Sequence, residues 1–221
     1  MLHLLLVRHG ETSWNVEHRL QGQRADLPLT DRGRTQAAAI AHCLKSWTID
    51  AVYSSDACRA RQTAQSICDA RALSAVETPS LRELDFGDWE GLTHGQARAD
   101  DPVRARAWEQ NPLDWAPPGG ESLANLACRM QSFVEGLLGE HADRTALLVS
   151  HGGPLRVLLA TSLGLAPTDY WRLRIAPGSL SELYLYPAGG LLTRLNFCPD
   201  PGQFDDKMRT GIDEHASQRD L

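Results

Sequence analysis

The sequence predicts an α/β fold in which helices cover both faces of a mostly parallel sheet, as a three-layer sandwich. Two observations support this prediction. Short, continuous apolar runs at residues 2–7, 49–53 and 145–149 have the length and composition of buried strands. Longer segments with apolar residues at helical spacing lie between them, and alternating strands and helices favour a parallel sheet. A chain of 221 residues buries about 70% of its unfolded surface, which is enough for a stable core.

The predicted elements of the first half are a strand at 2–7, a helix opening at 30–33, a strand at 49–53, a helix at about 57–70 and a short strand at 76–79. The first run is apolar throughout and leads directly into the charged residue Arg8, which is typical of a buried strand that enters a loop. The second run ends at Ser54, Ser55 and Asp56, whose side chains are good N-caps for the helix that follows.

The predicted elements of the second half are a helical insertion at 81–120, a helix at 122–140, a strand at 145–149, a helix at 155–163 and a closing hairpin of strands 181–186 and 191–197. The insertion contains three tryptophans and four prolines and ends in a Pro/Gly turn, so we expect it over the sheet edge and the site. After Cys198 the chain is polar and loses its periodicity. We therefore expect one domain at 1–198 and a mobile C-terminal tail at 199–221.

Composition and charge limit the partners of the chain. The formal net charge is −6, which argues against an extended nucleic-acid surface. No stretch approaches the ~20 apolar residues that span a bilayer. The N-terminal apolar run is too short for a secretory signal, so we expect a cytoplasmic protein without a membrane partner. The five cysteines have no metal-ligand spacing and are expected to be reduced thiols.

Reactive side chains follow three of the predicted strands, at the point where each strand ends. Arg8 and His9 follow the first strand, Ser55 and Arg59 follow the second, and His151 follows the strand at 145–149. In parallel sheets, sites form beyond the carboxyl ends of the strands. Each of these residues alone is more often structural than catalytic, so the prediction of a site depends on their joint placement.

A phosphomonoester site needs the residue types found there. The ester carries about two negative charges near neutral pH, and arginine grips two oxygens while staying charged, which suits Arg8 and Arg59. A neutral imidazole such as His9, held at the end of a rigid strand, can accept the phosphoryl group. His151 could donate a hydrogen bond to the phosphoryl oxygens, and a carboxylic acid would protonate the leaving oxygen.

Six blocks of short motifs extend this pattern along the chain. They are LVRHGET at 6–12 with Asn15, LQG at 20–22, PLTDRG at 28–33 with Gln36 and Ala37, SSDACRA at 54–60 with QTA at 62–64, LRELDFGDWEG at 81–91, and PGGES at 118–122 with VSHGG at 149–153. In their order and gaps, over residues 2–197, they resemble the histidine phosphatase superfamily, also called phosphoglycerate mutase-like. An isolated Arg-His-Gly triplet would be weak evidence, whereas six ordered blocks are strong evidence.

The resemblance implies a role for each matched residue. His9 would accept the phosphoryl group, and the phosphate pocket would be completed by Arg8, Arg59 and His151. The further substrate contacts that it implies are Asn15, Thr12, Gln21, Gly22 and Gly152.

The resemblance also implies the acid and the cofactor requirement. Glu83 aligns with the carboxylate that protonates the leaving oxygen and then activates water, with Glu90 and Asp85 as rivals nearby. No metal or other cofactor is implied, because fixed arginine charge replaces the magnesium ion of many phosphotransferases.

Two branches of the superfamily fit less well. The acid phosphatases and phytases resemble RHGxRxP and place an aspartate directly after the second histidine, whereas Gly152 follows His151 here. The glycolytic mutases have an arginine-rich substrate loop after the glutamate, and the arginines at 98, 104 and 106 do not match its pattern. We therefore expect hydrolysis, with a phosphoglycerate mutase as the alternative.

Among the phosphatases, residues 86–91 and 119–184 are most similar to alpha-ribazole phosphatases of cobalamin biosynthesis, which remove the 5′-phosphate of a benzimidazole nucleoside. Trp108 and Trp115 could stack on such a base, or could anchor the insertion in the core. The alternative is a broad-specificity metabolite phosphatase of the same family.

Two other classes of function are disfavoured. A non-catalytic binding domain would be expected to have lost His9 or the arginines, and all are present. A serine hydrolase is disfavoured because the chain has no G-x-S-x-G elbow and because adjacent residues such as Ser150 and His151 point in different directions. The expected partner is a small-molecule phosphomonoester, and a homodimer through a sheet edge is compatible with the sequence.

Overall fold

One mixed sheet organises the protein. The computed structural model describes residues 1–199 and contains six strands in the order β3-β2-β4-β1-β5-β6. The strands are β1 (Leu2–Arg8), β2 (Ala51–Ser54), β3 (Ala75–Glu77), β4 (Thr145–Ser150), β5 (Leu180–Tyr186) and β6 (Gly189–Phe197). The first four pair in parallel, whereas β5 and β6 add an antiparallel hairpin beside β1. The predicted strands and the mostly parallel sheet are therefore confirmed.

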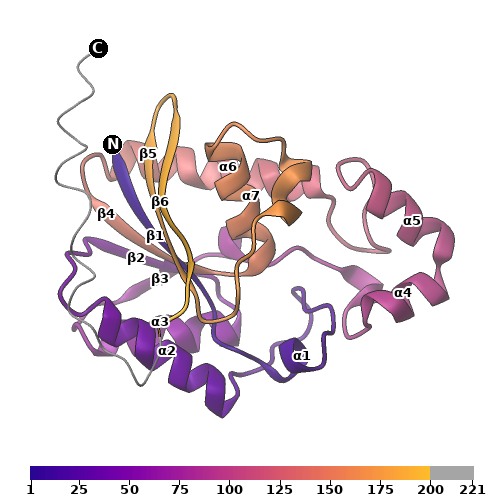
Figure 1. Cartoon of the computed structure of the whole chain (residues 1–221), viewed down its shortest axis with the longest axis horizontal. Helices are drawn as coiled ribbons and strands as arrows, with labels where there is room; N and C mark the ends of the chain where they lie inside the picture. Colours follow the sequence, from indigo (N-terminus) through magenta and orange to yellow (C-terminus); the bar gives the residue numbers. More distant parts are fainter. Residues whose placement is uncertain (200–221) are drawn as a thin grey trace.

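Helices cover both faces of this sheet, as Figure 1 shows. One face packs against α2 (Asp31–Cys43) and α3 (Cys58–Asp69), and the other against α6 (Leu123–Glu140) and α7 (Gly152–Ser162). Strand residues alternate between the two cores. On β1, Leu5 and Val7 belong to the core with α2 and α3, and Leu4 and Leu6 to the core with α6 and α7. The three-layer sandwich follows directly from this alternation.

Residues 81–120 are mostly short helices and turns. They include η2 (Gly87–Trp89), α4 (His94–Asp100) and α5 (Pro102–Gln110), and η1 (Pro79–Leu81) leads into them. A capping box between Thr93 and Gln96 starts α4, and the Asp101 side chain caps α5. Figure 1 shows α4 and α5 beyond the end of the sheet near α1, rather than across a sheet edge as expected.

Two short elements were not expected from the sequence. Helix α1 (Ser13–Val16) has four residues and depends on a capping box between Thr12 and Asn15 rather than on an apolar stripe. The 3₁₀ segment η3 (Pro167–Arg172) follows α7. Apart from Pro199, the tail predicted at 199–221 lies outside the described residues.

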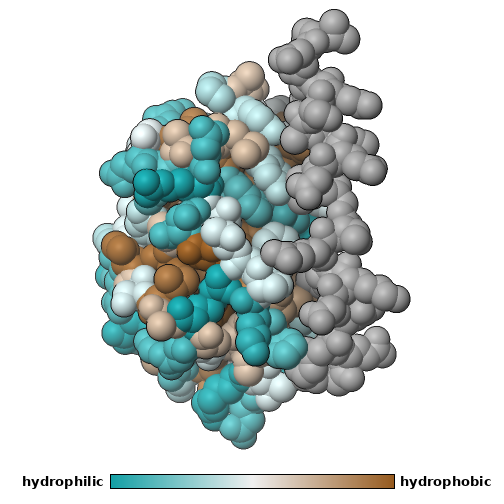
Figure 2. Space-filling view, turned by 90° about the vertical axis from the view of Figure 1, so that its left-hand side faces the viewer, coloured by the Kyte–Doolittle hydropathy of each residue, from teal (hydrophilic) through white to brown (hydrophobic). Residues whose placement is uncertain are grey.

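Figure 2 shows the end of the molecule that lies away from α4 and α5, where the parallel strands begin. This surface is mostly hydrophilic, with a small apolar area. None of the five cysteines, which all lie within the described residues, forms a disulfide. Among the described residues, none of the helices is long and apolar enough to cross a membrane.

Candidate active site

The strand ends meet as the sequence predicts. Parallel pairing places Arg8 of β1 opposite Ser150 of β4, so His9 and His151 leave the sheet side by side. The backbone continues this pairing, because His9 N donates to Ser150 O at 3.0 Å and Ser55 N donates to Val149 O at 2.9 Å. Both histidine side chains are therefore fixed by the sheet rather than by a free loop.

His9 is a buried imidazole with a defined tautomer. Its Nδ1 lies 2.7 Å from the carbonyl oxygen of Gly10, which can only accept, so Nδ1 carries the proton. Nε2 is left with its lone pair and has no hydrogen-bond partner among the described residues. Burial lowers the pKa of His9 well below 6.5, and the charges of Arg59 and Arg8 lower it further. The neutral, nucleophilic form is thus favoured at neutral pH.

His151 lies behind His9 and has the opposite tautomer. The two rings meet edge to face, with centroids 5.1 Å apart. Arg59 Nε donates to His151 Nδ1 at 3.1 Å, so the proton of neutral His151 lies on Nε2, which donates to Ser55 Oγ at 2.8 Å. Burial, and then Arg59, lowers the pKa of His151 well below 6.5.

The two predicted arginines both lie beside His9, with Arg59 buried and Arg8 partly buried. Arg8 Nη1 donates to the carbonyl of Ile175 at 2.7 Å, while its Nε is buried without a partner among the described residues. Burial lowers the pKa of Arg8 to about 10, so it remains charged at neutral pH. Arg59 Nη2 donates to Gly22 O at 2.8 Å, which ties the loop after α1 to the site.

Glu83 is the carboxylate that reaches the site. Its Oε1 accepts from Leu84 N and from Gly153 N, both at 2.9 Å. A Cβ at Gly153 would lie 2.3 Å from this oxygen, so only glycine allows the approach. Its rivals have other partners: Glu90 accepts from the backbone N–H groups of residues 23–25, and Asp85 accepts from that of residue 87.

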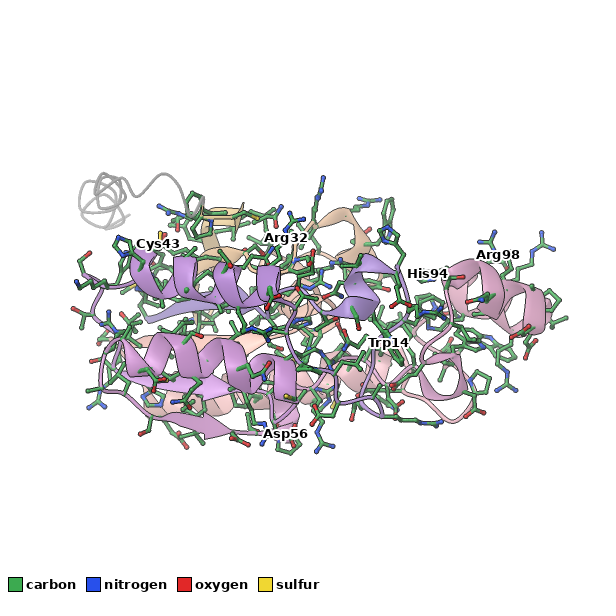
Figure 3. All side chains as sticks on the ribbon, turned by 90° about the horizontal axis from the view of Figure 1, so that it is seen from below. Trp14, Arg32, Cys43, Asp56, His94 and Arg98 are labelled. Carbon is green, nitrogen blue, oxygen red and sulfur yellow. The ribbon has the colours of Figure 1, made fainter. Side chains whose placement is uncertain are left out.

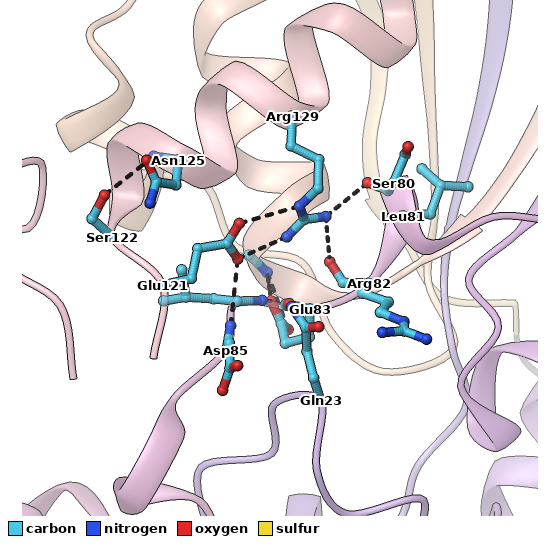
Figure 4. A network of polar contacts seen from close by, with 12 residues as sticks. Gln23, Ser80, Leu81, Arg82, Glu83, Asp85, Glu121, Ser122, Asn125 and Arg129 are labelled. Carbon is cyan, nitrogen blue, oxygen red and sulfur yellow. Dashed lines mark hydrogen bonds and ion pairs between the residues drawn. The ribbon is translucent and has the colours of Figure 1, made fainter. Parts of the chain in front are cut away.

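An ion pair between Arg129 of α6 and Glu121, just before this helix, holds the segment that carries Glu83 (Figure 4). Arg129 Nη1 donates to the carbonyls of Ser80 at 2.7 Å and Arg82 at 2.9 Å. The same guanidinium donates to both carboxylate oxygens of Glu121, at 3.2 and 2.8 Å. This fork-to-fork pair therefore fixes the backbone directly before Glu83.

Two neighbouring cavities open onto these residues, and Glu83 lines both. The first, of about 170 Å³, is lined by the following predicted residues: Arg8, His9, Asn15, Gln21, Glu83 and Gly152. The second, of about 180 Å³, is lined by Gly22, Arg59 and Glu83. The structure thus brings together eight of the ten predicted site residues as cavity walls, with His151 directly behind them.

Thr12 differs from the expectation, because it lines neither cavity. It is fully buried, and its hydroxyl donates to Gln21 Oε1 at 2.8 Å. Its backbone N–H donates to Asn15 Oδ1 at 3.1 Å. The side-chain oxygens of Asn15 and Gln21 therefore each accept a hydrogen bond from Thr12, which leaves their NH₂ groups as donors. The NH₂ group of Gln21 is buried without a partner among the described residues. Thr12 thus orients two amides of the cavity wall.

Comparison with known proteins places this geometry in a family. A family model described as the histidine phosphatase superfamily (branch 1) matches residues 4–197. The chain belongs to the histidine phosphatase superfamily.

The relatives are named for different activities. A probable phosphoglycerate mutase GpmB of Proteus mirabilis is 41% identical over 187 residues, which cover 83% of this chain and 85% of the relative. A glucosyl-3-phosphoglycerate phosphatase of Mycobacterium tuberculosis is 39% identical over 176 residues, covering 76% and 78%. The crystal structure of a putative alpha-ribazole-5′-P phosphatase from Escherichia coli superposes with a TM-score of 0.81 at 32% identity, covering 88% of this chain and 96% of that one.

Sequence reasoning missed several residues of this histidine phosphatase site. The first cavity is also lined by Arg19, His94, Arg156 and Tyr170. Arg156 follows Gly152 by four residues on α7 and so faces the same side, a spacing that the sequence does contain. His94 lies in the part of the molecule where α4 adjoins the main body (Figure 3). Its place in the cavity depends on the packing of α4, which no local pattern predicts.

Of the two tryptophans proposed for base stacking, only Trp108 lines the cavity. It is buried and packs edge to face on Trp89, with ring centroids 5.8 Å apart. Trp115 is 48% exposed and lines neither cavity. In the part of the chain that the structure describes, no group of three or more His, Cys, Asp or Glu side chains is arranged to hold a metal ion.

Proposed function

We propose that this histidine phosphatase hydrolyses phosphomonoesters in two steps, through a phosphohistidine formed at Nε2 of His9. The observation that carries the proposal is the state of this ring. Its proton is held at Nδ1 by the carbonyl of Gly10, its pKa is well below 6.5, and it lines the cavity that Arg8 and Glu83 also line. A neutral imidazole with a free lone pair is the form that attacks phosphorus.

In the first step, His9 Nε2 forms a bond to phosphorus as the bond to the ester oxygen breaks. Glu83, as the carboxylic acid, gives its proton to the leaving oxygen, which departs as the alcohol. Arg8, Arg59 and the amide groups of Asn15 and Gln21 offset the charge on the phosphoryl oxygens.

In the second step, the Glu83 carboxylate takes a proton from water while the water oxygen attacks phosphorus. The bond between nitrogen and phosphorus breaks, and His9 Nε2 recovers its lone pair. The products are the alcohol and inorganic phosphate, and Glu83 ends protonated, as it began.

His151 supports this chemistry through Arg59. Its Nδ1 accepts from Arg59 Nε and holds that guanidinium beside His9. To donate to a phosphoryl oxygen as the family resemblance implies, Nε2–H must exchange Ser55 Oγ for that oxygen.

The arginines of residues 92–118 favour hydrolysis over a mutase reaction. The family resemblance gives the glycolytic mutases an arginine-rich substrate loop in this part of the chain, and the arginines found here are not placed to form one over the cavity. Arg98 pairs with Glu109 at 2.6 Å, and Figure 3 shows it at the far end of the molecule. Arg104 faces Asp101 at 3.7 Å, and neither arginine lines the cavity.

Two substrate classes follow from different observations. The resemblance to alpha-ribazole phosphatases, together with Phe86 and Trp108 in the cavity wall, makes alpha-ribazole 5′-phosphate and a role in cobalamin assembly one candidate. A metabolite ester with a second anionic group is the other candidate, and Arg156 favours it, as argued below.

The test is phosphate release in EDTA across alpha-ribazole 5′-phosphate, 3-phosphoglycerate, phosphoserine, sugar phosphates and an aryl phosphate, with His9→Ala as the control. We expect hydrolysis that the substitution abolishes. Turnover that survives in His9→Ala would contradict the proposed nucleophile. Phosphoryl transfer between glycerate positions without phosphate release would instead identify a mutase.

A further inference from the structure

Arg156 is a cation in the cavity wall that the proposed reaction does not use. It lies on α7 and lines the first cavity with His9 and Arg8. Its Nε is buried without a partner, and its guanidinium makes no hydrogen bond or ion pair within residues 1–199. Arg19, in the same wall, differs because it pairs with Glu17 at 2.5 Å. Arg156 is therefore a charge kept in a cavity without its counter-charge.

Such an arrangement is unfavourable in the free protein. Arg156 is partly buried, and burying its Nε without an acceptor costs free energy, because no hydrogen bond replaces the one that this N–H makes to water. The positive charge of Arg156 also disfavours the charged form of Arg8 nearby. Glu83 is the only carboxylate among the described residues that line this cavity, and its two oxygens already accept from the backbone. An anionic group of the ligand would therefore supply the counter-charge that Arg156 lacks in this cavity.

The surrounding groups add donors rather than acceptors. Tyr170 of η3 lines the same cavity, and its hydroxyl has no hydrogen-bond partner in the described part of the chain. Burial raises the pKa of Tyr170, so the hydroxyl keeps its proton and can donate. Trp108 also lines the cavity, and its Nε1–H is buried without a partner among the described residues. These three groups, Arg156, Tyr170 and Trp108, are called the distal donors below.

The phosphoryl group does not need the distal donors. Its two negative charges are matched by Arg8 and Arg59, and Glu83 is neutral when it serves as the acid. The charge of Arg156 is then left for the alcohol part of the substrate. A guanidinium binds a carboxylate through two parallel hydrogen bonds, which suits one added negative charge.

We propose that the distal donors bind a carboxylate on the alcohol portion of the substrate, with Arg156 as the residue that selects it. The inference rests on the proposed hydrolysis at His9 and narrows its substrates to carboxylate-bearing phosphomonoesters. Alpha-ribazole 5′-phosphate has no carboxylate, so this site makes it a poorer substrate than 3-phosphoglycerate or phosphoserine.

Matched esters test the proposal. The pairs 3-phosphoglycerate with glycerol 3-phosphate, and phosphoserine with phosphoethanolamine, differ within each pair by the carboxylate. One charged, bidentate contact predicts a preference of about 10- to 100-fold in kcat/KM for the acid. In Arg156→Gln the preference for the acid over its matched partner should fall to within about 3-fold, mainly through KM of the acids. Arg156→Lys, which keeps the charge, should recover part of the preference.

Arg172→Gln is the matched control, because Arg172 lies on η3 beside Tyr170 but pairs with Asp169 at 3.1 Å and lines neither cavity. It should keep the wild-type preference. The proposal would be overturned if the wild-type enzyme had the same kcat/KM for both members of a pair. It would also be overturned if Arg156→Gln lowered kcat/KM equally for both members.

Binding separates this inference from the proposed function. The affinities of the same esters for His9→Ala, measured by calorimetry with and without Arg156→Gln, do not depend on turnover. A preference for the acids that Arg156→Gln removes supports the carboxylate site even if no ester is hydrolysed. Equal affinities for both members of a pair would contradict it even if hydrolysis occurs.

Discussion

Replacing Arg129 by Met tests whether its ion pair with Glu121 holds the segment that carries Glu83. Methionine keeps most of the volume but removes four hydrogen bonds, two to the carbonyls of Ser80 and Arg82 and two to Glu121. Removing one partner of a buried pair costs about 3–5 kcal/mol, because the other charge stays buried. Arg129 and Glu121 retain 21% and 15% exposure, so water screens part of this cost. We expect the free energy of unfolding to fall by about 2–4 kcal/mol.

Equilibrium unfolding in urea measures this cost. With an m-value of about 2 kcal/mol per M, the midpoint should fall by about 1–2 M at unchanged m. Arg98→Met is the control, because Arg98 also pairs with a glutamate but is 64% exposed, and it should cost about 0.5 kcal/mol or less. Adding Glu121→Gln to Arg129→Met should recover about 1–2 kcal/mol, since it removes the orphaned charge.

The same variant has a kinetic consequence. Without Arg129 the backbone before Glu83 loses its anchor, so kcat should fall more for alkyl phosphates, which need a proton donor, than for an aryl phosphate. The reasoning would be refuted if Arg129→Met lowered the free energy of unfolding by less than about 1 kcal/mol, or if the losses caused by Arg129→Met and Glu121→Gln were additive in the double variant.

Three further predictions concern the catalytic groups. Glu83→Gln should lower kcat on alkyl phosphates about 10²- to 10⁴-fold and on an aryl phosphate much less, and equal losses on both would assign Glu83 another role. Because the pKa values of His9 and His151 are below the unfolded value of about 6.5, the unfolded chain binds more protons in acid. The contribution of each neutral histidine to the free energy of unfolding should be fully present above about pH 6.5 and fall by up to ~1.4 kcal/mol per pH unit below it. Denaturation at several pH values checks this, and a free energy of unfolding that does not change with pH would contradict neutral histidines. Phosphate release should be unchanged by EDTA, because arginines supply the positive charge, and loss of activity restored by a divalent ion would contradict this.

The sequence was sufficient to predict the framework of the site. Continuous apolar runs mark β1, β2 and β4, and parallel pairing brings their ends together without further information. Arg8, His9, Arg59 and His151 therefore meet as predicted. The position of α4 and α5 could not be predicted in this way, because it depends on contacts between residues far apart in the chain.

The proposed acid, Glu83, is indicated by the family resemblance rather than by spacing. Glu83, Asp85 and Glu90 lie within eight residues, and spacing alone does not say which carboxylate faces His9. The structure separates them by their partners, since Glu90 binds three backbone N–H groups of the loop at residues 23–25. The tautomers of the two histidines were likewise out of reach, because each depends on one acceptor or donor that folding supplies.

The measurement that tests the central claim most directly is capture of the phosphoenzyme. The protein is mixed with a ³²P-labelled ester, quenched in base within a single turnover, digested, and the labelled peptide is mapped. We predict label on His9 that is stable in base, lost in acid and absent from His9→Ala, and that decays at least as fast as kcat. Turnover with no label on His9, or label that decays more slowly than phosphate is released, would contradict a phosphohistidine at this residue.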